Sequence, residues 1–224
     1  MRVRIVVFSI ILILTIAVAI IAYREFVAQV PCGNDLFADD NGSFESGNFV
    51  PNANGGMDLL NGANDLTDWT ITVSPTSNNP IAWDSDANRF NIKAQNGRKF
   101  VTLAGDGNPP QEPYPFLTRV GIRVQQGRYR LKFYLGQDPS NGFPGPVSAD
   151  VGVSGAAATL HHTFSTNANG PTWQEQTLDF NVPTNGTIDI AFGATAGQSK
   201  LPVRYVGLDN ISLRRLEPVF QCSQ

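Results

Sequence analysis

The sequence has few of the residues that catalytic and metal sites most often use. Among its 224 residues are 2 His and 2 Cys. The histidines, His161 and His162, are adjacent, so on a strand they point to opposite faces and cannot share one metal or one general-base position. Gly152-Val-Ser154-Gly155 lacks the spacing of a Gly-x-Ser-x-Gly nucleophile elbow. We therefore predict that the protein is not an enzyme, with a hydrolase that uses an unrecognised pair of carboxylates as the weaker alternative.

Positive charge is also scarce. The chain has 16 Lys and Arg against 19 Asp and Glu, a net charge of -3, and charged residues make up only 16% of it. A phosphate-binding surface needs an excess of Lys and Arg, so nucleic acid is not expected as the main partner. The 42% of hydrophobic residues is too high for a disordered chain.

One stretch lacks charge altogether. From Ile5 to Tyr23 there is no Asp, Glu, Lys or Arg, and Arg2 and Arg4 precede this run. At about 1.5 Å per residue, a helix of roughly 19 residues crosses most of the ~30 Å hydrocarbon core of a bilayer. We predict that residues 1–30 form a signal-anchor or transmembrane helix whose N-terminus stays in the cytoplasm. A cleaved signal peptide is the alternative, although its apolar region is usually about 7–15 residues long.

Both alternatives place residues 31–224 on the extracytoplasmic side, periplasmic or extracellular, and secreted if the helix is cleaved. This region holds 13 basic and 18 acidic residues and carries -5, so an anionic membrane surface repels it. Its two cysteines, Cys32 and Cys222, bracket it. In an oxidising compartment a disulfide is the simplest expectation for this pair, and two free thiols are the alternative.

Apolar and polar residues alternate through most of this region. Trp69–Val73, Tyr129–Phe133 and Ile188–Phe192 are examples, and turn residues such as Gln126-Gly127 separate the runs. Period-2 alternation marks strands with one buried face and one wet face. Before residue 69 the chain is rich in Asn, Asp and Gly, which indicates loops around one short strand. We predict one all-β domain over residues 31–224, a jelly-roll β-sandwich of about 8–9 antiparallel strands.

Four motifs follow one another in a recognisable order. They are Asn41-Gly-Ser-Phe-Glu45, Gly97-Arg-Lys-Phe-Val-Thr-Leu103, Gly127-Arg-Tyr-Arg-Leu-Lys-Phe133 and Gly207-Leu-Asp-Asn-Ile-Ser-Leu213. Across residues 39–216 this order resembles the galactose-binding-like jelly-roll superfamily. It is most similar to carbohydrate-binding modules that begin NGxFE and end LDNVSL, and to the related secreted domain of plant cell walls and bacteria.

The resemblance implies that the first and last strands are neighbours and that a structural calcium ion lies beside them. Carried over, its ligands would be Glu45, Asp209 and backbone carbonyls, although Ca²⁺ needs about 6–8 oxygens. The alternative is that Glu45 and Asp209 accept ordinary hydrogen bonds from turn amides.

A sugar site needs an exposed aromatic ring beside polar groups that bind hydroxyls. The aromatic candidates in expected loops are Trp83, Tyr114, Phe116, Phe143 and Trp173. From these we predict ligand-binding residues Trp83 with Asp84, and Tyr114, with Gln137 and Asp138 as polar neighbours. Core packing is the alternative for every one of these aromatic residues, and it is favoured for Trp69 and Trp173.

Together these observations predict a non-catalytic, extracytoplasmic binding domain tethered by its N-terminal helix, with a carbohydrate or cell-surface polymer as ligand. The alternative is a structural or accessory single-span subunit that docks other membrane-complex subunits through its β-sandwich. Fold alone does not decide between them.

Overall fold

The computed structural model describes residues 33–38, 40–72, 80–104, 114–137, 145–157, 159–167, 170–195 and 205–216. The predicted N-terminal helix (1–30), both cysteines and Asp138 lie outside these ranges. Among the described residues, no helix has the length and apolar character of a membrane span.

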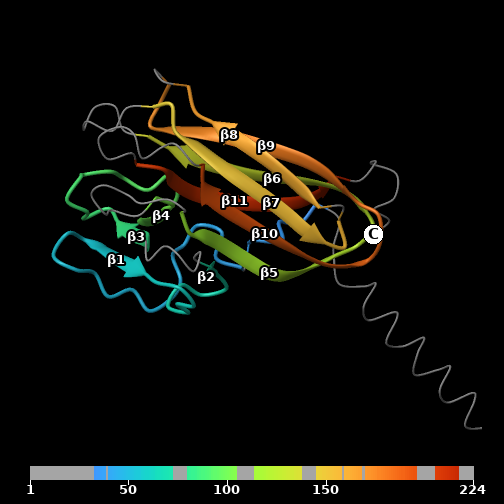
Figure 1. Ribbon diagram of the computed structural model, residues 1–224, viewed down its shortest axis with the longest axis horizontal. Coiled ribbons are helices and arrows are strands. Elements are labelled where there is room, and N and C mark those ends of the chain that lie inside the picture. The colour runs from blue at the N-terminus through green and yellow to red at the C-terminus, as the bar shows by residue number, and fades with distance from the viewer. Residues whose placement is uncertain are drawn as a thin grey trace, which may run out of the picture.

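The described residues form eleven β-strands in two antiparallel sheets (Figure 1). One sheet has six strands in the order β1-β3-β4-β11-β6-β9, and the other has five in the order β2-β5-β10-β7-β8. The all-β sandwich prediction is therefore confirmed over these ranges. The strands are β1 (Gly56–Leu59), β2 (Thr70–Thr72), β3 (Ile81–Ser85), β4 (Lys99–Thr102), β5 (Phe116–Val124), β6 (Gly127–Gly136), β7 (Ser148–Gly155), β8 (Leu160–Ser165), β9 (Trp173–Val182), β10 (Gly186–Ala194) and β11 (Gly207–Leu216).

The alternation of apolar and polar residues predicted eight or nine strands. It did not reveal β3 and β8. Four consecutive residues of β3, Ile81 to Asp84, are buried, because both faces of this strand are covered and no alternation is needed. In β8 most side chains are exposed or half-buried, and only Phe164 is buried. A strand at the edge of a sheet with one buried residue leaves too little pattern to detect.

The core lies between the two sheets. On β6 the buried residues Tyr129, Leu131 and Phe133 alternate with side chains that point outward. The ring of Phe133 meets that of Phe192, on β10 of the other sheet, edge to face at 5.2 Å. Burying one such Phe side chain stabilises the fold by about 1.5–3 kcal/mol.

The opening motif lies against the last strand, as the resemblance implied. The carbonyl of Gly42 accepts a hydrogen bond from the N–H of Ile211 at 2.8 Å, and the N–H of Leu36 donates to the carbonyl of Leu213 at 2.8 Å. A Cβ on Gly42 would collide with the carbonyl oxygen of Ile211, so this close approach requires glycine. The predicted proximity of the first and last motifs is therefore confirmed.

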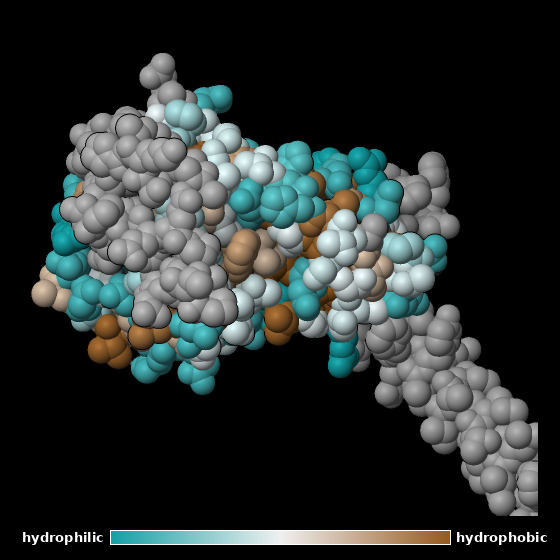
Figure 2. All heavy atoms as spheres, in the orientation of Figure 1, coloured by the Kyte–Doolittle hydropathy of each residue, from teal (hydrophilic) through white to brown (hydrophobic). Residues whose placement is uncertain are grey.

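Polar and apolar residues are interspersed on the visible surface of the described residues. Figure 2 shows hydrophilic and neutral residues over most of it, with brown apolar side chains in small patches. Among the described residues, the exposed large apolar side chains are Val50, Leu60, Phe116 and Val120. Two of these four, Phe116 and Val120, lie on β5, on the outer face of the five-stranded sheet.

Candidate functional site

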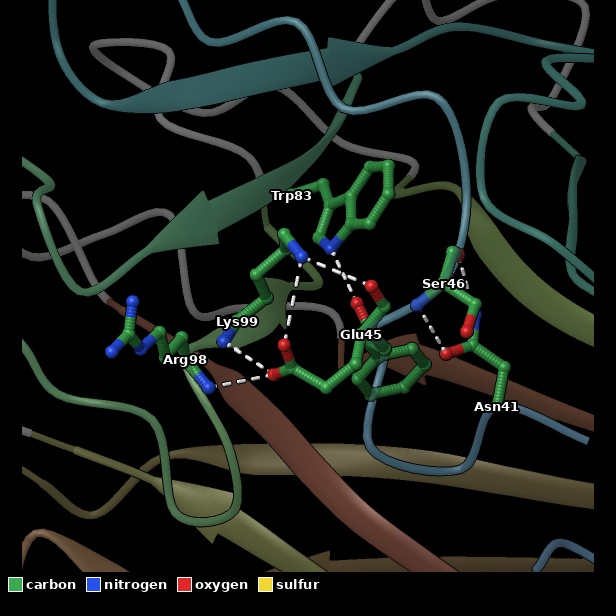
Figure 3. A network of polar contacts seen from close by, with 7 residues as sticks. Asn41, Glu45, Ser46, Trp83, Arg98 and Lys99 are labelled. Carbon is green, nitrogen blue, oxygen red and sulfur yellow. Dashed lines mark hydrogen bonds and ion pairs between the residues drawn. The ribbon is translucent and has the colours of Figure 1, made fainter. Parts of the chain in front are cut away.

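The predicted sugar-stacking residues are not exposed. Trp83 has no exposed surface and donates its indole N–H to the carbonyl of Phe44 at 2.9 Å (Figure 3). It packs under the opening motif, where Phe49 meets its ring edge to face at 4.8 Å. Tyr114 is only 5% exposed. A sugar cannot stack on a ring that is covered by protein, so the prediction that Trp83 and Tyr114 form the site is wrong.

The polar residues predicted beside them are structural as well. Asp84 is buried and accepts a hydrogen bond from the Thr102 hydroxyl at 2.8 Å. Gln137 is completely buried, donating to the carbonyl of Asn167 at 2.8 Å and accepting from the Thr166 hydroxyl. These side chains satisfy buried polar groups and have no free surface to offer a ligand. The remaining predicted residue, Asp138, lies outside the described residues.

The alternative reading of Trp69 and Trp173 as packing residues is confirmed. Trp69 is 2% exposed and stacks on Phe37 at 5.7 Å. Trp173 is half-buried, donates its indole N–H to the carbonyl of Lys93 at 2.9 Å, and meets Phe100 edge to face.

Glu45 anchors a polar network that joins the opening motif to β4 (Figure 3). Its Oε1 accepts backbone N–H bonds from Arg98 and Lys99, both at 2.7 Å. The Lys99 ammonium donates to the Glu45 carbonyl at 3.0 Å and lies 3.5 Å from Oε2. Gly97, with a φ of +76°, completes the turn, and a Cβ there would strike the Glu45 carboxylate.

Asp209 holds the same loop from the other side. Its Oδ2 accepts the N–H groups of Gln95 and Asn96 at 2.8 and 2.9 Å, and its Oδ1 accepts that of Asn210 at 2.7 Å. Burial raises the pKa of Asp209 to about 7, although these three amides oppose the shift, and the nearby negative charge of Glu45 adds to it. The side chain has no exposed surface.

This donor set does not fit the calcium ion that the resemblance implied. Ca²⁺ requires about 6–8 oxygen ligands. Glu45 and Asp209 instead face N–H donors, and an ammonium group already neutralises Glu45. Among the described residues, no group of three or more His, Cys, Asp or Glu side chains could hold a metal. The arrangement is the alternative that the sequence analysis gave, in which both carboxylates bind turn amides.

A hollow of about 550 Å³ adjoins this network, lined by Glu45, Ser85, Asp86, Ala87, Arg98 and Lys99. Three of its charged side chains, those of Glu45, Asp86 and Lys99, already have protein partners. Besides the Glu45 and Lys99 contacts, Asp86 accepts the N–H of Ala94 at 2.8 Å. We therefore assign this region to holding the loop between β3 and β4.

The outer face of the five-stranded sheet carries the better candidate. Register places Thr72, Phe116, Gly193, Asp150 and Thr163 side by side, one residue from each of β2, β5, β10, β7 and β8. We call this line the Phe116 row. Phe116 is 43% exposed, and its ring covers Gly193, where a Cβ would come within 2.7 Å of a ring carbon. At the other end, Thr163 donates its hydroxyl hydrogen to Oδ1 of Asp150 at 2.6 Å.

The next line of residues leaves this face open. It consists of Thr70, Thr118, Ala191, Gly152 and His161, in register across the same five strands. Its members on β10 and β7, Ala191 and Gly152, are small, so this line places no large side chain beside Gly193 and Asp150. Since neighbouring strands lie about 4.8 Å apart, roughly 10 Å separates the aromatic position from the carboxylate position. Because the Phe116 ring itself covers Gly193, a sugar on this span would rest on the exposed side of that ring and reach toward Asp150.

Two sequence signals could have found this site. Phe116 and Leu117 are adjacent apolar residues at the start of a strand, and adjacent residues point to opposite faces, so in a strand with one wet face one of them is exposed. Alternation in Ala149-Asp150-Val151 likewise points Asp150 outward. What the sequence does not contain is the register that aligns Phe116, Gly193 and Asp150, because it depends on pairing between distant strands.

The chain matches no protein-family model and no curated protein sequence. Among solved structures it is similar to carbohydrate-binding modules. The CBM22-1 xylan-binding domain of Paenibacillus barcinonensis Xyn10C is 11% identical, with a TM-score of 0.45, and the match covers 85% of this chain and 99% of that domain. TmCBM61, solved in complex with β-1,4-galactotriose, is 17% identical with a TM-score of 0.40, over 79% and 96% of the two chains.

CBM35 from Paenibacillus barcinonensis is 14% identical with a TM-score of 0.41, over 72% of this chain and 98% of that one. Some similar chains are enzymes that the match covers only in part, such as the isomalto-dextranase of Arthrobacter globiformis T6, of which it covers 24%. At TM-scores below 0.5 and these identities, the likeness transfers no ligand and no binding residue to this chain.

Proposed function

We propose that the domain is a non-catalytic module that binds a neutral polysaccharide across the outer face of its five-stranded sheet. The observation that carries this proposal is the Phe116 row, in which an exposed aromatic ring lies over Gly193 and is followed by a carboxylate and a hydroxyl. Sugars bind by placing C–H groups on an aromatic face while carboxylates and hydroxyls accept or donate hydrogen bonds. A sheet face of five strands can hold several sugar units of an extended chain.

The charge of this face offers no basic patch for an anionic ligand. Asp150 and Asp189 lie on it together with one exposed arginine, Arg123 of β5, and the region after residue 30 carries -5. A neutral polysaccharide is therefore favoured here over an anionic one. Asp189 is already engaged, because its Oδ1 accepts the N–H of Gly121 at 2.8 Å in a bulge of β5.

The spacing of these two carboxylates supports binding without hydrolysis. Asp150, on β7, pairs with Gly193 on β10. Asp189 is also on β10, four residues before Gly193. At about 3.4 Å per residue, roughly 13 Å separates their positions along the strand, and glycosidases hold their pair about 5–9.5 Å apart. The two acids on this face are therefore too distant to act together on one glycosidic bond.

We further propose that residues 1–30 tether the module to a membrane with the sandwich on the extracytoplasmic side. The support for this part is the uncharged run from Ile5 to Tyr23 and the arginines that precede it. A tether of this kind would hold the binding face near the cell surface, where wall or surface polysaccharides are found.

The full chain in mild detergent, applied to a glycan array and to insoluble polysaccharides, tests the binding proposal. We expect retention on at least one neutral glycan and about tenfold weaker binding for Phe116→Ala, which corresponds to about 1.4 kcal/mol. Leu60→Ala, which removes another exposed apolar side chain, is the matched control and should bind normally. Copurification of a stoichiometric protein partner without any glycan binding would instead favour the docking alternative.

A further inference from the structure

The outer face of the other sheet is basic, although the domain is acidic. On β6 the same alternation that buries Leu131 and Phe133 points Arg128, Arg130 and Lys132 outward. Residues two apart on a strand are about 6.8 Å apart, so these cations form a line on one face. The adjacent strand β11 adds Arg214, which is paired in register with Arg130.

Two arginines directly opposite each other on neighbouring strands repel, and such a pair is destabilising unless something lies between or beside them. The acids that offset the β6 cations are on β9, the strand that flanks β6 on the side away from β11. Asp179 accepts from Nε and Nη2 of Arg130 at 2.8 and 2.9 Å and from Arg128 at 2.8 Å. The hydrogen bond from Arg130 lowers the pKa of Asp179, so this acid is ionised and fixes the guanidinium.

Charge compensation is weaker on the β11 side of Arg130. Arg214 pairs with Asp35 at 3.9 Å, and the Arg214 side chain is 59% exposed. The bidentate pair with Asp179 uses Nε and Nη2 of Arg130 and leaves its third nitrogen, Nη1, outside that pair. Asp179 on β9 therefore positions Arg130, while Arg214 lies opposite it on β11.

A pocket of about 300 Å³ lies at this junction and is lined by Arg130, Lys132, Ser212, Arg214 and Leu216. We call it the basic pocket. Its lining supplies three cations, one hydroxyl and one apolar side chain. No carboxylate lines it, although each cation has an acid beside the pocket, and the pairs of Lys132 with Glu175 at 3.6 Å and of Arg214 with Asp35 at 3.9 Å are the long ones. Grouped guanidinium and ammonium donors match the geometry of oxyanions, for which arginine forms the strongest charge-assisted hydrogen bonds.

We propose that the basic pocket binds a carboxylate or sulfate group carried by a sugar unit of an anionic polysaccharide. An oxyanion placed between Arg130 and Arg214 relieves their repulsion, and Ser212 supplies a further hydroxyl. Leu216 offers an apolar wall for the C–H groups of the sugar, and the volume is at the lower end for a small-molecule site, enough for a single ring. This site is separate from the Phe116 row and does not depend on it.

The test uses the full chain in non-ionic detergent and affinity gel electrophoresis with polygalacturonate, dextran sulfate or neutral dextran in the gel. We expect retardation by at least one of the two anionic polymers, no retardation by dextran, and weakening as salt screens the ion pairs. Arg214→Gln should weaken binding at least tenfold. Arg128→Gln removes the same charge from the same face but outside the pocket, and should change binding less than about twofold.

Three results would overturn the proposal. They are the absence of retardation by both anionic polymers, equal losses in Arg214→Gln and Arg128→Gln, and binding to phosphatidylglycerol vesicles without binding to either polymer. A thermal melt of each variant checks folding, and Lys132→Gln provides a second pocket variant with the same expected loss. Phe116→Ala should keep its affinity for the anionic polymer, so failure at this pocket and failure of the neutral-glycan proposal can be told apart.

Discussion

Glu45 and Lys99 are bonded in both directions. The carboxylate of Glu45 accepts the backbone N–H of Lys99 at 2.7 Å, and the ammonium of Lys99 donates to the backbone carbonyl of Glu45 at 3.0 Å (Figure 3). The ammonium also lies 5.7 Å from the centre of the buried Trp83 ring. These contacts join the opening motif to β4 at the position where the resemblance implied a metal ion.

We expect Glu45→Ala to lower the free energy of unfolding by about 1–3 kcal/mol, because the N–H groups of Arg98 and Lys99 lose their shared acceptor. Urea denaturation followed by tryptophan fluorescence measures this. Glu175→Ala is the control, since its partners are the exposed groups Tyr134 and Lys132, and it should cost less than about 1 kcal/mol. Equal losses in both variants would contradict the role given to Glu45.

Calcium should not stabilise the fold. Both carboxylates that could have bound it accept N–H donors, and Lys99 places a positive charge beside Glu45. We expect the melting temperature of the chain to be the same in EDTA and in excess calcium chloride, because a ligand raises it only by binding the folded state. A clear rise with calcium that Glu45→Gln abolishes would show that the site does take the ion.

The pKa of Asp209, about 7 in the folded protein against 3.8 as its ordinary value, predicts a pH dependence. Between about pH 4 and pH 7 the folded state keeps a proton that the unfolded state has released. The contribution of this group to stability is therefore full below pH 4 and falls as pH rises, by up to about 1.4 kcal/mol per unit.

Asp209→Asn cannot titrate, so we expect the slope of unfolding free energy against pH to be flatter in this variant than in the wild type over that window. The variant should also be less stable overall, because an amide offers one acceptor oxygen for three N–H donors. Denaturation with a chelator present at several pH values measures both. Parallel curves for the two proteins would refute the assignment.

Gly193→Ala tests whether the position of the Phe116 ring over Gly193 matters for binding, without replacing the aromatic residue. A Cβ at Gly193 meets the Phe116 ring at 2.7 Å, so the exposed ring must swing away from the sheet. We expect little change in the melting temperature, because an exposed side chain can move, and a loss of neutral-glycan affinity similar to that of Phe116→Ala. Unchanged affinity would mean that the ring position above Gly193 is not used.

The sequence predicted the sandwich better than the site, for a physical reason. Alternation reports which side of a strand is buried, and Tyr129, Leu131 and Phe133 fall in the core as it indicated. It could not show that Trp83 lies on a strand covered on both faces, since loop-like neighbours such as Asp84 and Asp86 suggested exposure.

The candidate site depends on the pairing of strands that are distant in the sequence. Phe116 is among the aromatic candidates, but its value as a binding residue comes from Gly193 and Asp150, which lie 77 and 34 positions away in the chain. In the sheet they are one and two strands away from it. Similarly, the motifs indicated that Glu45 and Asp209 lie near the same strands, while the N–H donors of residues 95–99 that occupy both carboxylates became visible only in the structure.

The most direct measurement is the affinity of the wild-type chain and of Phe116→Ala for the neutral polysaccharide that the array selects, by isothermal titration calorimetry. The account predicts saturable binding by the wild type, about tenfold weaker binding by Phe116→Ala at unchanged melting temperature, and normal binding by Leu60→Ala. No neutral glycan bound by the wild type, or equal affinity of the wild type and Phe116→Ala, would contradict it.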